Sequence, residues 1–311
     1  MTALVREPIP LTARPGPRPP AAGAASLMLR PVLDPPRRPA RVIAVFPTAV
    51  YLELRGPEEP RVVAVVTSDA VRPPNAVVVV AERRDRPFHR IREGLEAWVG
   101  DGRVEAAGLH VRVRRWWAPS PALGTMSPPA LARGLRSLEN SLTAAGMTGG
   151  GLAGHPDPLQ LAERCAAGDL AGAVEAAERI VGLGPGLTPS GDDILSGMLV
   201  SLRLLGGAVR PGGTAVWLAD WLGAAVTADA GTRTTALSAT LLHCAAAGGA
   251  GAEVAAVLRG VAGHEAPAAA VRRLLSVGHT SGADLAWGVL AGSRATLALA
   301  SATEHSHRAT A

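Results

Sequence analysis

A glycine-rich stretch in the second half of the chain has the residue types best suited to binding a small ligand. It reads Gly182-Leu-Gly-Pro-Gly-Leu-Thr-Pro-Ser-Gly-Asp-Asp193 and leads into a predicted helix. Gly184, Gly186 and Gly191 leave the backbone open, so the unpaired N–H groups of the helix start are available to phosphate or carboxylate. It is not a dinucleotide-binding fingerprint, because Leu187 stands where glycine is needed and a helix precedes the loop. The alternative is that the loop is only a cap and a packing turn.

Two adjacent carboxylates end this stretch, and the sequence predicts different roles for them. Ser190 and Asp193 have the spacing of a capping box, with Ser190 as the N-cap and Asp193 at the third helical position. Asp192 gains little at this place and repels its neighbour. We therefore predict that Asp192 binds a ligand, either through an amide N–H of the ligand or through a Mg²⁺ ion that bridges it to a phosphate.

Part of the loop recurs later in the chain. Ser190-Gly-Asp-Asp-Ile-Leu-Ser-Gly197 returns as Ser281-Gly-Ala-Asp-Leu-Ala-Trp-Gly288, which keeps Ser281 and Asp284 but has alanine in place of Asp192. Residues common to both copies are predicted to be structural, so Asp192, the turn at 184–186 and His279 are the better functional candidates. His279 has an alternative interpretation as a polar residue at a helix end.

Hydroxyl groups and an arginine gather between the two copies. In the segment 231–238, Thr234, Thr235 and Ser238 fall on one side of a predicted helix and need hydrogen-bond partners, either backbone carbonyls or a ligand. Arg233 is placed to make a bidentate contact with a carboxylate or phosphate. The alternative is an exposed arginine beside a threonine cap.

Hydrophobic periodicity divides the chain into two kinds of structure and predicts the α+β class. A Pro/Arg-rich tail over residues 1–40, predicted to be disordered, precedes a β-rich domain over 41–118 that includes a short helix at 90–99. A larger all-helical domain over 125–303 carries the glycine-rich motif, and a disordered tail at 304–311 ends the chain. The predicted strands are 42–45, 50–54, 61–67, 76–81 and 109–116, and the predicted helices are 129–145, 158–167, 170–181, 192–205, 214–227, 233–247, 252–261, 267–277 and 282–291.

Composition excludes several kinds of chemistry. All 31 basic residues are arginine, so no Schiff base or Walker-type phosphate lysine is present. The net charge of +5 lies mostly in residues 1–40, which argues against nucleic-acid binding. Cys165 and Cys244 form no metal or disulfide pattern and are predicted to be reduced core residues. Prolines interrupt the N-terminus, so no secretory signal is predicted, and we expect a cytoplasmic protein without membrane contact.

Three blocks of residues resemble a known family. The stretch 184–193, the pair Thr234-Thr235 with Ser238, and the stretch 278–284 are similar to the motifs of bacterial proteins that include AllH (YlbF-like), a subunit of oxamate carbamoyltransferase. The resemblance covers residues 40–300 and leaves the N-terminal tail outside. It implies carbamoyl transfer between carbamoyl phosphate and oxamate in purine-derived allantoin catabolism, together with companion subunits.

The residues and the resemblance therefore predict a carbamoyltransferase-type subunit that binds a small anionic ligand at helix N-termini. The alternatives are a non-catalytic anion-sensing or scaffold subunit and a Mg²⁺-dependent phosphate-ester enzyme, which would need Asp220 or Asp229 near Asp192. Apart from a Mg²⁺ ion at Asp192, no cofactor is predicted. The predicted catalytic residues are Asp192 and His279, and the predicted ligand-binding residues are Gly184, Gly186, Thr188, Ser190, Gly191, Asp193, Arg233, Thr234, Thr235, Ser238, Ser281 and Asp284.

Overall fold

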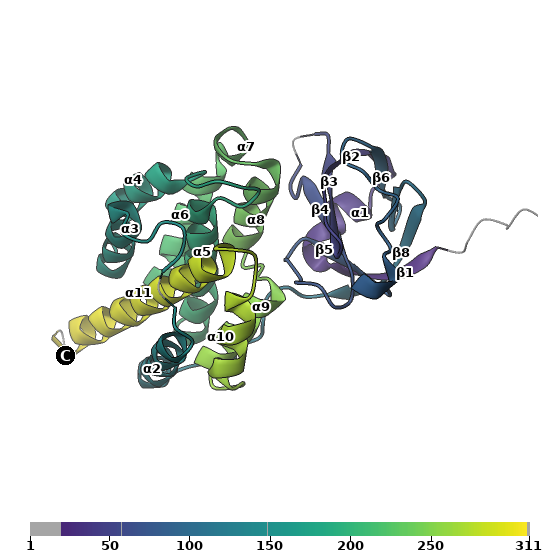
Figure 1. Cartoon of the computed structure of the whole chain (residues 1–311). Coiled ribbons are helices and arrows are strands. Elements are labelled where there is room, and N and C mark those ends of the chain that lie inside the picture. The colour runs from purple at the N-terminus through teal and green to yellow at the C-terminus, as the bar shows by residue number, and fades with distance from the viewer. Residues whose placement is uncertain (1–19, 57, 148, 310–311) are drawn as a thin grey trace, which may run out of the picture.

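The chain folds into a β-barrel followed by a larger helical domain (Figure 1). The computed structural model describes residues 20–56, 58–147 and 149–309, of which 303–309 as backbone only. Within these residues the α+β class, with a β-rich N-terminal part and an all-helical C-terminal part, is confirmed.

In the described part of the chain, eight strands close into the barrel in the order β1-β5-β4-β3-β2-β6-β7-β8. They are β1 (Ala21–Ser26), β2 (Arg38–Val45), β3 (Ala49–Leu54), β4 (Val62–Val66), β5 (Ala76–Val79), β6 (Glu96–Gly100), β7 (Arg103–Ala106) and β8 (Leu109–Trp117). Neighbours are antiparallel except that β1 runs parallel to β8 and β4 runs parallel to β5. Valine, leucine and alanine from these strands fill the barrel core.

The prediction of a disordered tail over residues 1–40 is wrong for the part that the structure describes. β1 pairs with both β5 and β8, and the short helices η1 (Leu27–Leu29) and α1 (Arg30–Leu33) bury Leu29 and Leu33 in the barrel core. Alanine-rich segments have little intrinsic preference for strands, so the two neighbouring strands provide the stability that composition does not predict. The rest of the predicted tail, 1–19, lies outside the described residues.

The predicted helix at 90–99 is also wrong. Its first half forms turns and its second half enters β6, which pairs with β2 and β7. In β6 the buried Ala97 and Val99 alternate with the exposed Trp98, which is the pattern of a half-buried strand. A short 3₁₀ helix, η2 (Arg83–Asp85), precedes this region.

The helical domain is built around α5. Its helices are α2 (Pro128–Ala144), α3 (Pro156–Ala167), α4 (Leu170–Ile180), α5 (Ser190–Val209), α6 (Thr214–Thr227), α7 (Ala230–Arg233), α8 (Ala236–Ala246), α9 (Ala252–Val261), α10 (Pro267–Leu275) and α11 (Ser281–Ala309). The predicted apolar stripe of α5 is buried, and so are residues of its other faces, because α6, α8 and α11 surround it.

Several helix ends differ from the prediction. α5 continues past Gly206, which the sequence predicts as a stop, because this glycine lets α6 approach closely: a Cβ on it would lie 2.9 Å from that of Ala215. The predicted helix at 233–247 begins too early: Arg233 is the last residue of α7, the backbone of Thr234 is extended, and α8 starts at Ala236. α11 runs to Ala309, so the predicted end at 291 and the predicted disorder of 304–309 are wrong, while 310–311 lie outside the described residues.

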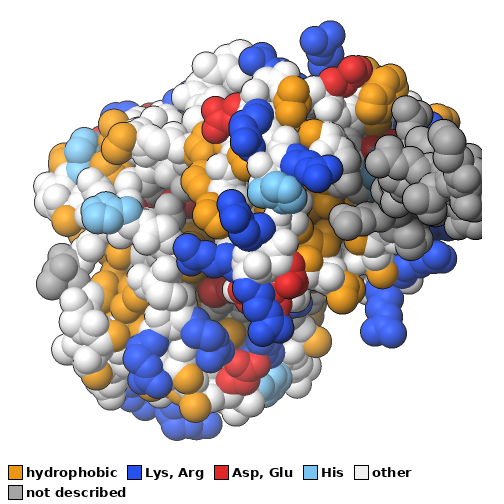
Figure 2. Space-filling model, turned by 45° about the vertical axis from the view of Figure 1, so that its right-hand side comes forward, with side chains coloured by type: hydrophobic (Ala, Val, Ile, Leu, Met, Phe, Trp, Pro, Cys, Tyr) orange, Lys and Arg blue, Asp and Glu red, His pale blue; other side chains and the backbone are white. Residues whose placement is uncertain are grey.

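The barrel and the helical domain touch along β3, β4 and α8. Thr240 on α8 accepts a hydrogen bond from the N–H group of Val62 at 3.1 Å and donates one to Glu59, also at 3.1 Å. The N–H group of Ala252, at the start of α9, donates to the carbonyl of Arg72 at 2.9 Å. Figure 2 brings the barrel side forward and shows arginine side chains spread over this face, with apolar side chains between them.

Two features of the helical domain follow from burial. Both cysteines, Cys165 and Cys244, are free and buried, as predicted, and burial raises the pKa of each thiol to about 12. The stretch Ser281–Ala302 of α11 is long and apolar enough to cross a membrane, but half of it is buried inside the protein. It packs along α5, as expected for the core helix of a helical domain.

Candidate functional site

The glycine-rich loop before α5 is held against the start of α8. Gly182 and Gly184 have φ angles of +72° and +117°, which side-chain-bearing residues rarely adopt. A Cβ on Gly182 would overlap with the carbonyl oxygen of Arg233, and one on Gly184 would lie 2.9 Å from the nitrogen of Ser190. Glycine at these two positions therefore lets the loop turn and pass close to neighbouring backbone.

Asp192 joins three segments from inside the protein. Its Oδ1 accepts a hydrogen bond from the N–H group of Gly182 at 2.8 Å, and its Oδ2 accepts one from the hydroxyl of Ser238 at 2.7 Å and another from the hydroxyl of Thr234. Nearby, the hydroxyl of Thr235 donates to the carbonyl of Leu187 at 2.6 Å. These donors satisfy Asp192 within the protein, so its carboxylate holds the loop and the start of α8 together.

The predicted capping box is wrong. Pro189 is the N-cap of α5, Ser190 is the first helical residue, and no side chain caps the helix start. The helix therefore starts one residue earlier than the capping box predicts, and Ser190 lies inside its first turn. Ser190 and Asp193 are therefore free to face other partners.

Asp193 points away from Asp192 and lines a cavity. The residue is only 5% exposed, and its Oδ2 has no hydrogen-bond partner. Burial raises the pKa of this carboxyl from 3.8 to about 7, the nearby carboxyls of Asp284 and Asp192 raise it further, and hydrogen bonds from the hydroxyls of Ser281 and Thr188 lower it. Asp193 is thus a buried carboxyl that changes its charge close to neutral pH.

The two sequence copies meet and exchange side-chain contacts. The hydroxyl of Ser281 hydrogen-bonds to Asp193, and that of Ser190 hydrogen-bonds to Asp284, so each serine serves the carboxyl of the other copy. Asp284 also accepts a hydrogen bond from the N–H group of Gly151 at 2.9 Å. Burial raises the pKa of Asp284 as well.

Glycines allow α5 and α11 to cross at close range. A Cβ on Gly197 would overlap with the carbonyl oxygen of Leu285, and a Cβ on Gly288 would overlap with that of Ile194. These four residues are equivalent pairs in the two copies, so the packing is symmetric. The two copies therefore lie side by side, and the starts of α5 and α11 are close together.

The backbone N–H groups of residues 191–193 and 282–284, in the first turns of these two helices, already donate hydrogen bonds within the protein. In α5, the N–H of Gly191 donates to the carbonyl of Leu183 at 2.9 Å, and those of Asp192 and Asp193 donate to Pro189 at 3.0 and 3.1 Å. In α11, the N–H groups of residues 282, 283 and 284 donate to carbonyls of Val277 and Thr280. An anion bound to these groups would have to replace existing hydrogen bonds, so the side chains offer the more accessible ligand contacts.

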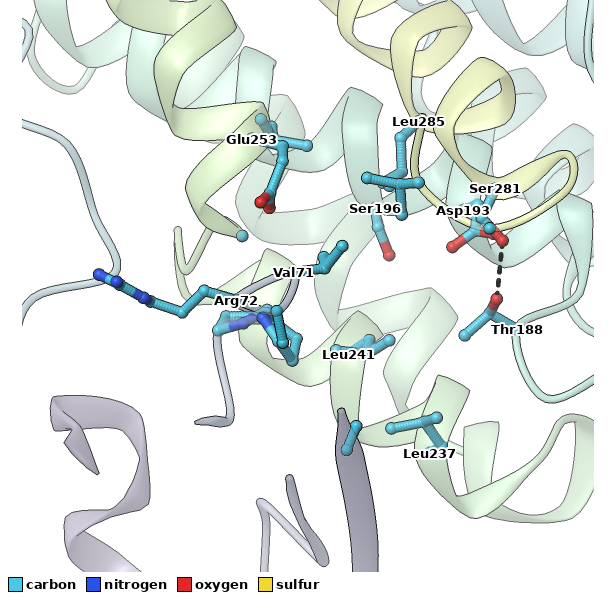
Figure 3. Close-up of a pocket in the computed structure, with 18 of the residues that line it drawn as sticks. Val71, Arg72, Thr188, Asp193, Ser196, Leu237, Leu241, Glu253, Ser281 and Leu285 are labelled. Atoms are coloured by element: carbon cyan, nitrogen blue, oxygen red, sulfur yellow. Dashed lines mark hydrogen bonds between the residues drawn. The ribbon is translucent and has the colours of Figure 1, made fainter. Parts of the chain in front are cut away.

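A cavity of about 520 Å³ lies between the starts of α5 and α11 and the barrel. Figure 3 shows Asp193, Ser281 and Thr188 together at one end, Glu253 and Arg72 toward the other, and Val71 and Leu241 between them. The hydroxyls of Thr188 and Ser281 lie 3.0 Å apart. The apolar part of the wall comes from both domains and includes Phe46, Tyr51, Val71, Leu187, Leu237, Leu241, Val254 and Leu285.

The structure brings only some of the predicted site residues to this cavity. Thr188, Asp193 and Ser281 line it. Others contact the loop and helix starts behind the wall: Gly184, Ser190, Gly191, Asp192, Thr234, Thr235, Ser238 and Asp284. Gly186 lies in the exposed turn of the loop, where a Cβ would have no neighbour within 4 Å. His279 is exposed and follows Gly278, which lies on the cavity wall. Arg233 donates to the carbonyl of Glu178 and lies 3.5 Å from Asp229, so it is engaged at the surface of the helical domain.

Other residues of the cavity were not predicted from the sequence. Ser196 on α5 and Glu253 on α9 both line it, and burial raises the pKa of Glu253. Ser196 could have been found from the sequence, because it is a polar residue within the strongly apolar helix α5. The barrel residues of the wall carry no such signal, because only the docking of the two domains places them there.

The residues around Asp192 do not resemble a metal centre. Its oxygens accept hydrogen bonds from three protein donors, which leaves them turned away from a cation. Asp220 forms an ion pair with Arg203 and Asp229 one with Arg233, so neither supports the phosphate-ester enzyme. Over the described ranges no cluster of three or more His, Cys, Asp or Glu side chains is placed to hold a metal.

Comparison with known proteins identifies the segment that forms this site. Residues 180–293 match the family described as oxamate carbamoyltransferase subunit AllH. No curated protein and no solved structure matches the chain significantly. The matched segment begins at the last residue of α4 and ends within α11, so it contains the glycine-rich loop, Asp192, Asp193 and both sequence copies. Residues 180–293 of the chain are therefore similar to the AllH family of oxamate carbamoyltransferase subunits, which confirms the resemblance of its three motif blocks.

Proposed function

We propose that the chain is a subunit of a cytoplasmic carbamoyltransferase-type complex, acting with companion subunits on a small carboxylic acid amide such as oxamate. The family match supports the subunit role, and the cavity beside the matched segment supports the site. In this proposal the small anionic substrate binds in the cavity at the starts of α5 and α11, within the purine-derived allantoin catabolism that the family name suggests.

The main support for this substrate site is Oδ2 of Asp193, which lies on the cavity wall without a hydrogen-bond partner. A buried acceptor of this kind is costly unless a donor reaches it, and an amide N–H of the substrate is such a donor. The hydroxyls of Thr188, Ser196 and Ser281 line the same cavity and are suited to hydrogen-bond the oxygens of the substrate.

The same carboxyl suits proton transfer during carbamoyl transfer. The amide nitrogen of oxamate attacks the carbamoyl carbon of carbamoyl phosphate, the bond from that carbon to the phosphate oxygen breaks, and phosphate leaves. The attacking nitrogen loses a proton, which the Asp193 carboxylate accepts. A general base works best when its pKa lies near the working pH, and burial raises the pKa of Asp193 to about 7. Asp192 acts as a positioning residue, because it holds the loop that precedes Asp193.

The test measures phosphate release from oxamate and carbamoyl phosphate by the chain, alone and together with the proteins encoded beside its gene. We expect turnover with the companion proteins present and a loss of about 10²-fold or more in kcat for Asp193→Asn. His279→Ala is a further arm, since this exposed residue next to Gly278 is the other predicted catalytic group. If no combination releases phosphate, the carbamoyltransferase assignment is wrong.

A scaffold or anion-sensing subunit is the second candidate. It is favoured by the N–H groups of residues 191–193 and 282–284, which already donate within the protein and would have to exchange these hydrogen bonds to bind a phosphate. In that case a companion subunit performs the chemistry, and this chain binds ligand without turnover. Activity of the complex that survives Asp193→Asn, together with ligand binding by this chain alone, would favour the scaffold role.

A further inference from the structure

The cavity is much larger than oxamate or carbamoyl phosphate requires. Its volume of about 520 Å³ falls in the range of roughly 300–1,000 Å³ that is typical of pockets for drug-sized ligands. A ligand with only a few non-hydrogen atoms would occupy the end near Asp193 and leave the rest to water. Oxamate and carbamoyl phosphate therefore do not account for the size of the cavity.

Apolar side chains form most of the remaining wall. Leu237, Leu241 and Leu285 from the helical domain face Val71 from the barrel, with Phe46 and Tyr51 nearby. Phe46 and Val71 are 45% and 44% exposed, although they are large apolar residues. Apolar surface that stays open to water in a concave site is stabilised when an apolar group covers it.

Polar groups at one end determine which head group fits. The unpartnered Oδ2 of Asp193 accepts a hydrogen bond, while the hydroxyls of Thr188 and Ser281 both donate and accept. A primary amide matches this set, because its NH₂ group donates to the carboxylate and its carbonyl accepts from a hydroxyl. A carboxylate head would instead meet the carboxyl of Asp193 with like charge.

We infer that the cavity binds a primary amide with an extended apolar body, whose head meets Asp193 and whose body lies between Val71 and Leu241. The inference rests on the proposed function for the position of the amide and extends it to the class of substrate. Oxamate then shares only the amide head group with this class, and amides with longer apolar bodies bind more tightly than short ones.

The experiment uses four soluble probes that differ in one property each: hexanamide, acetamide, hexanoate and hexylammonium. Calorimetric titration of the full chain is done at about pH 8, where the Asp193 carboxyl with a pKa of about 7 is largely ionised. We expect hexanamide to bind at least about tenfold more tightly than acetamide, because each buried methylene contributes about fourfold in affinity. Hexanoate and hexylammonium are expected to bind more weakly than hexanamide.

Two valines of the barrel provide a matched pair of variants. Val71→Trp fills the apolar part of the cavity and is expected to weaken hexanamide binding about tenfold, with little effect on acetamide. Val80→Trp is the control, because Val80 is 81% exposed and lies outside the cavity wall. Thermal melts of both variants establish that they fold as the parent does. Asp193→Asn is expected to weaken hexanamide and acetamide alike.

Other binding results overturn the inference, and activity separates it from the proposed function. Equal affinity for acetamide and hexanamide shows that the apolar wall does not bind the ligand body. Tighter binding of hexanoate or hexylammonium shows that the head group is an acid or an amine instead of an amide. Phosphate release from oxamate without hexanamide binding leaves the proposed function standing and removes the inference. Hexanamide binding without carbamoyl transfer does the reverse.

Discussion

Asp192 and Asp193 are neighbours in the chain, yet the carboxyl of Asp192 accepts three hydrogen bonds from the protein whereas Oδ2 of Asp193 accepts none. The first turn of α5 sends one side chain toward the start of α8 and the other into the cavity. One carboxyl therefore stabilises the fold, and the other is available to a ligand. This difference leads to the first two predictions.

Asp192→Asn is expected to lower the free energy of unfolding by about 2–3 kcal/mol. The amide has one acceptor oxygen where the carboxylate has two, so its NH₂ group faces either the N–H group of Gly182 or the hydroxyls of Thr234 and Ser238. Urea unfolding monitored by circular dichroism measures the change. A variant as stable as the parent would show that these contacts add nothing to stability.

Asp193→Asn is expected to change the pH dependence of stability. The carboxyl keeps its proton up to about pH 7 in the folded protein but loses it at 3.8 when unfolded. The folded state thus holds an extra proton between these values, and the free energy of unfolding of the parent falls as pH rises from 3.8 to 7 and levels off above. The variant lacks this decrease, so its stability relative to the parent rises by up to about 1.4 kcal/mol per pH unit in that window.

The measurement compares urea unfolding of the parent and the variant at several pH values. Glu253 and Asp284, whose pKa values burial also raises, remain in both proteins, so the difference between the two curves reports Asp193 together with its interaction with Asp284. Parallel curves from pH 4 to pH 8, within about 0.5 kcal/mol, would mean that Asp193 titrates as an ordinary aspartate.

Gly197→Ala and Gly288→Ala are each expected to destabilise the protein by about 3 kcal/mol or more. The new methyl group would overlap with the carbonyl oxygen of Leu285 or Ile194, so α5 and α11 must separate. Gly207→Ala is the control on the same helix, because a Cβ there has no neighbour within 4 Å. It is expected to stabilise the protein by about 0.5–1 kcal/mol, since alanine favours a helix over glycine. Thermal melts of the three variants measure these changes. A shift of the melting temperature in the same direction for all three would argue against the close crossing.

Leu33→Ala is expected to cost about 2–5 kcal/mol of stability. Leu33 is fully buried in the barrel core although it lies in the segment whose composition resembles a disordered tail. Leu27→Ala provides the comparison, because Leu27 is 40% exposed and its truncation leaves no buried cavity. Equal unfolding midpoints for the two variants would show that α1 does not contribute to the core.

Local patterns in the sequence were enough to predict the two-part architecture. Short valine-rich runs bounded by proline and glycine identify β2 to β5 and β8, and an apolar stripe of period 3.6 identifies α5. The glycine-rich loop, the two copies at 190–197 and 281–288 and the family resemblance were also visible without a structure. All of these signals lie within a few consecutive residues or in direct repetition.

Only the tertiary structure decided which groups face the cavity. β1 consists of alanine, glycine and serine alone, so its place in the barrel depends on hydrogen bonds to strands far along the chain. The direction of the Asp192 and Asp193 side chains depends on Pro189 as the N-cap and on the hydroxyls that α8 brings near, which shifts the helix start by one residue and exchanges the roles of the two carboxyls. The apolar wall forms where the barrel docks on the helical domain, and contacts between residues so distant in sequence leave no pattern in either segment alone.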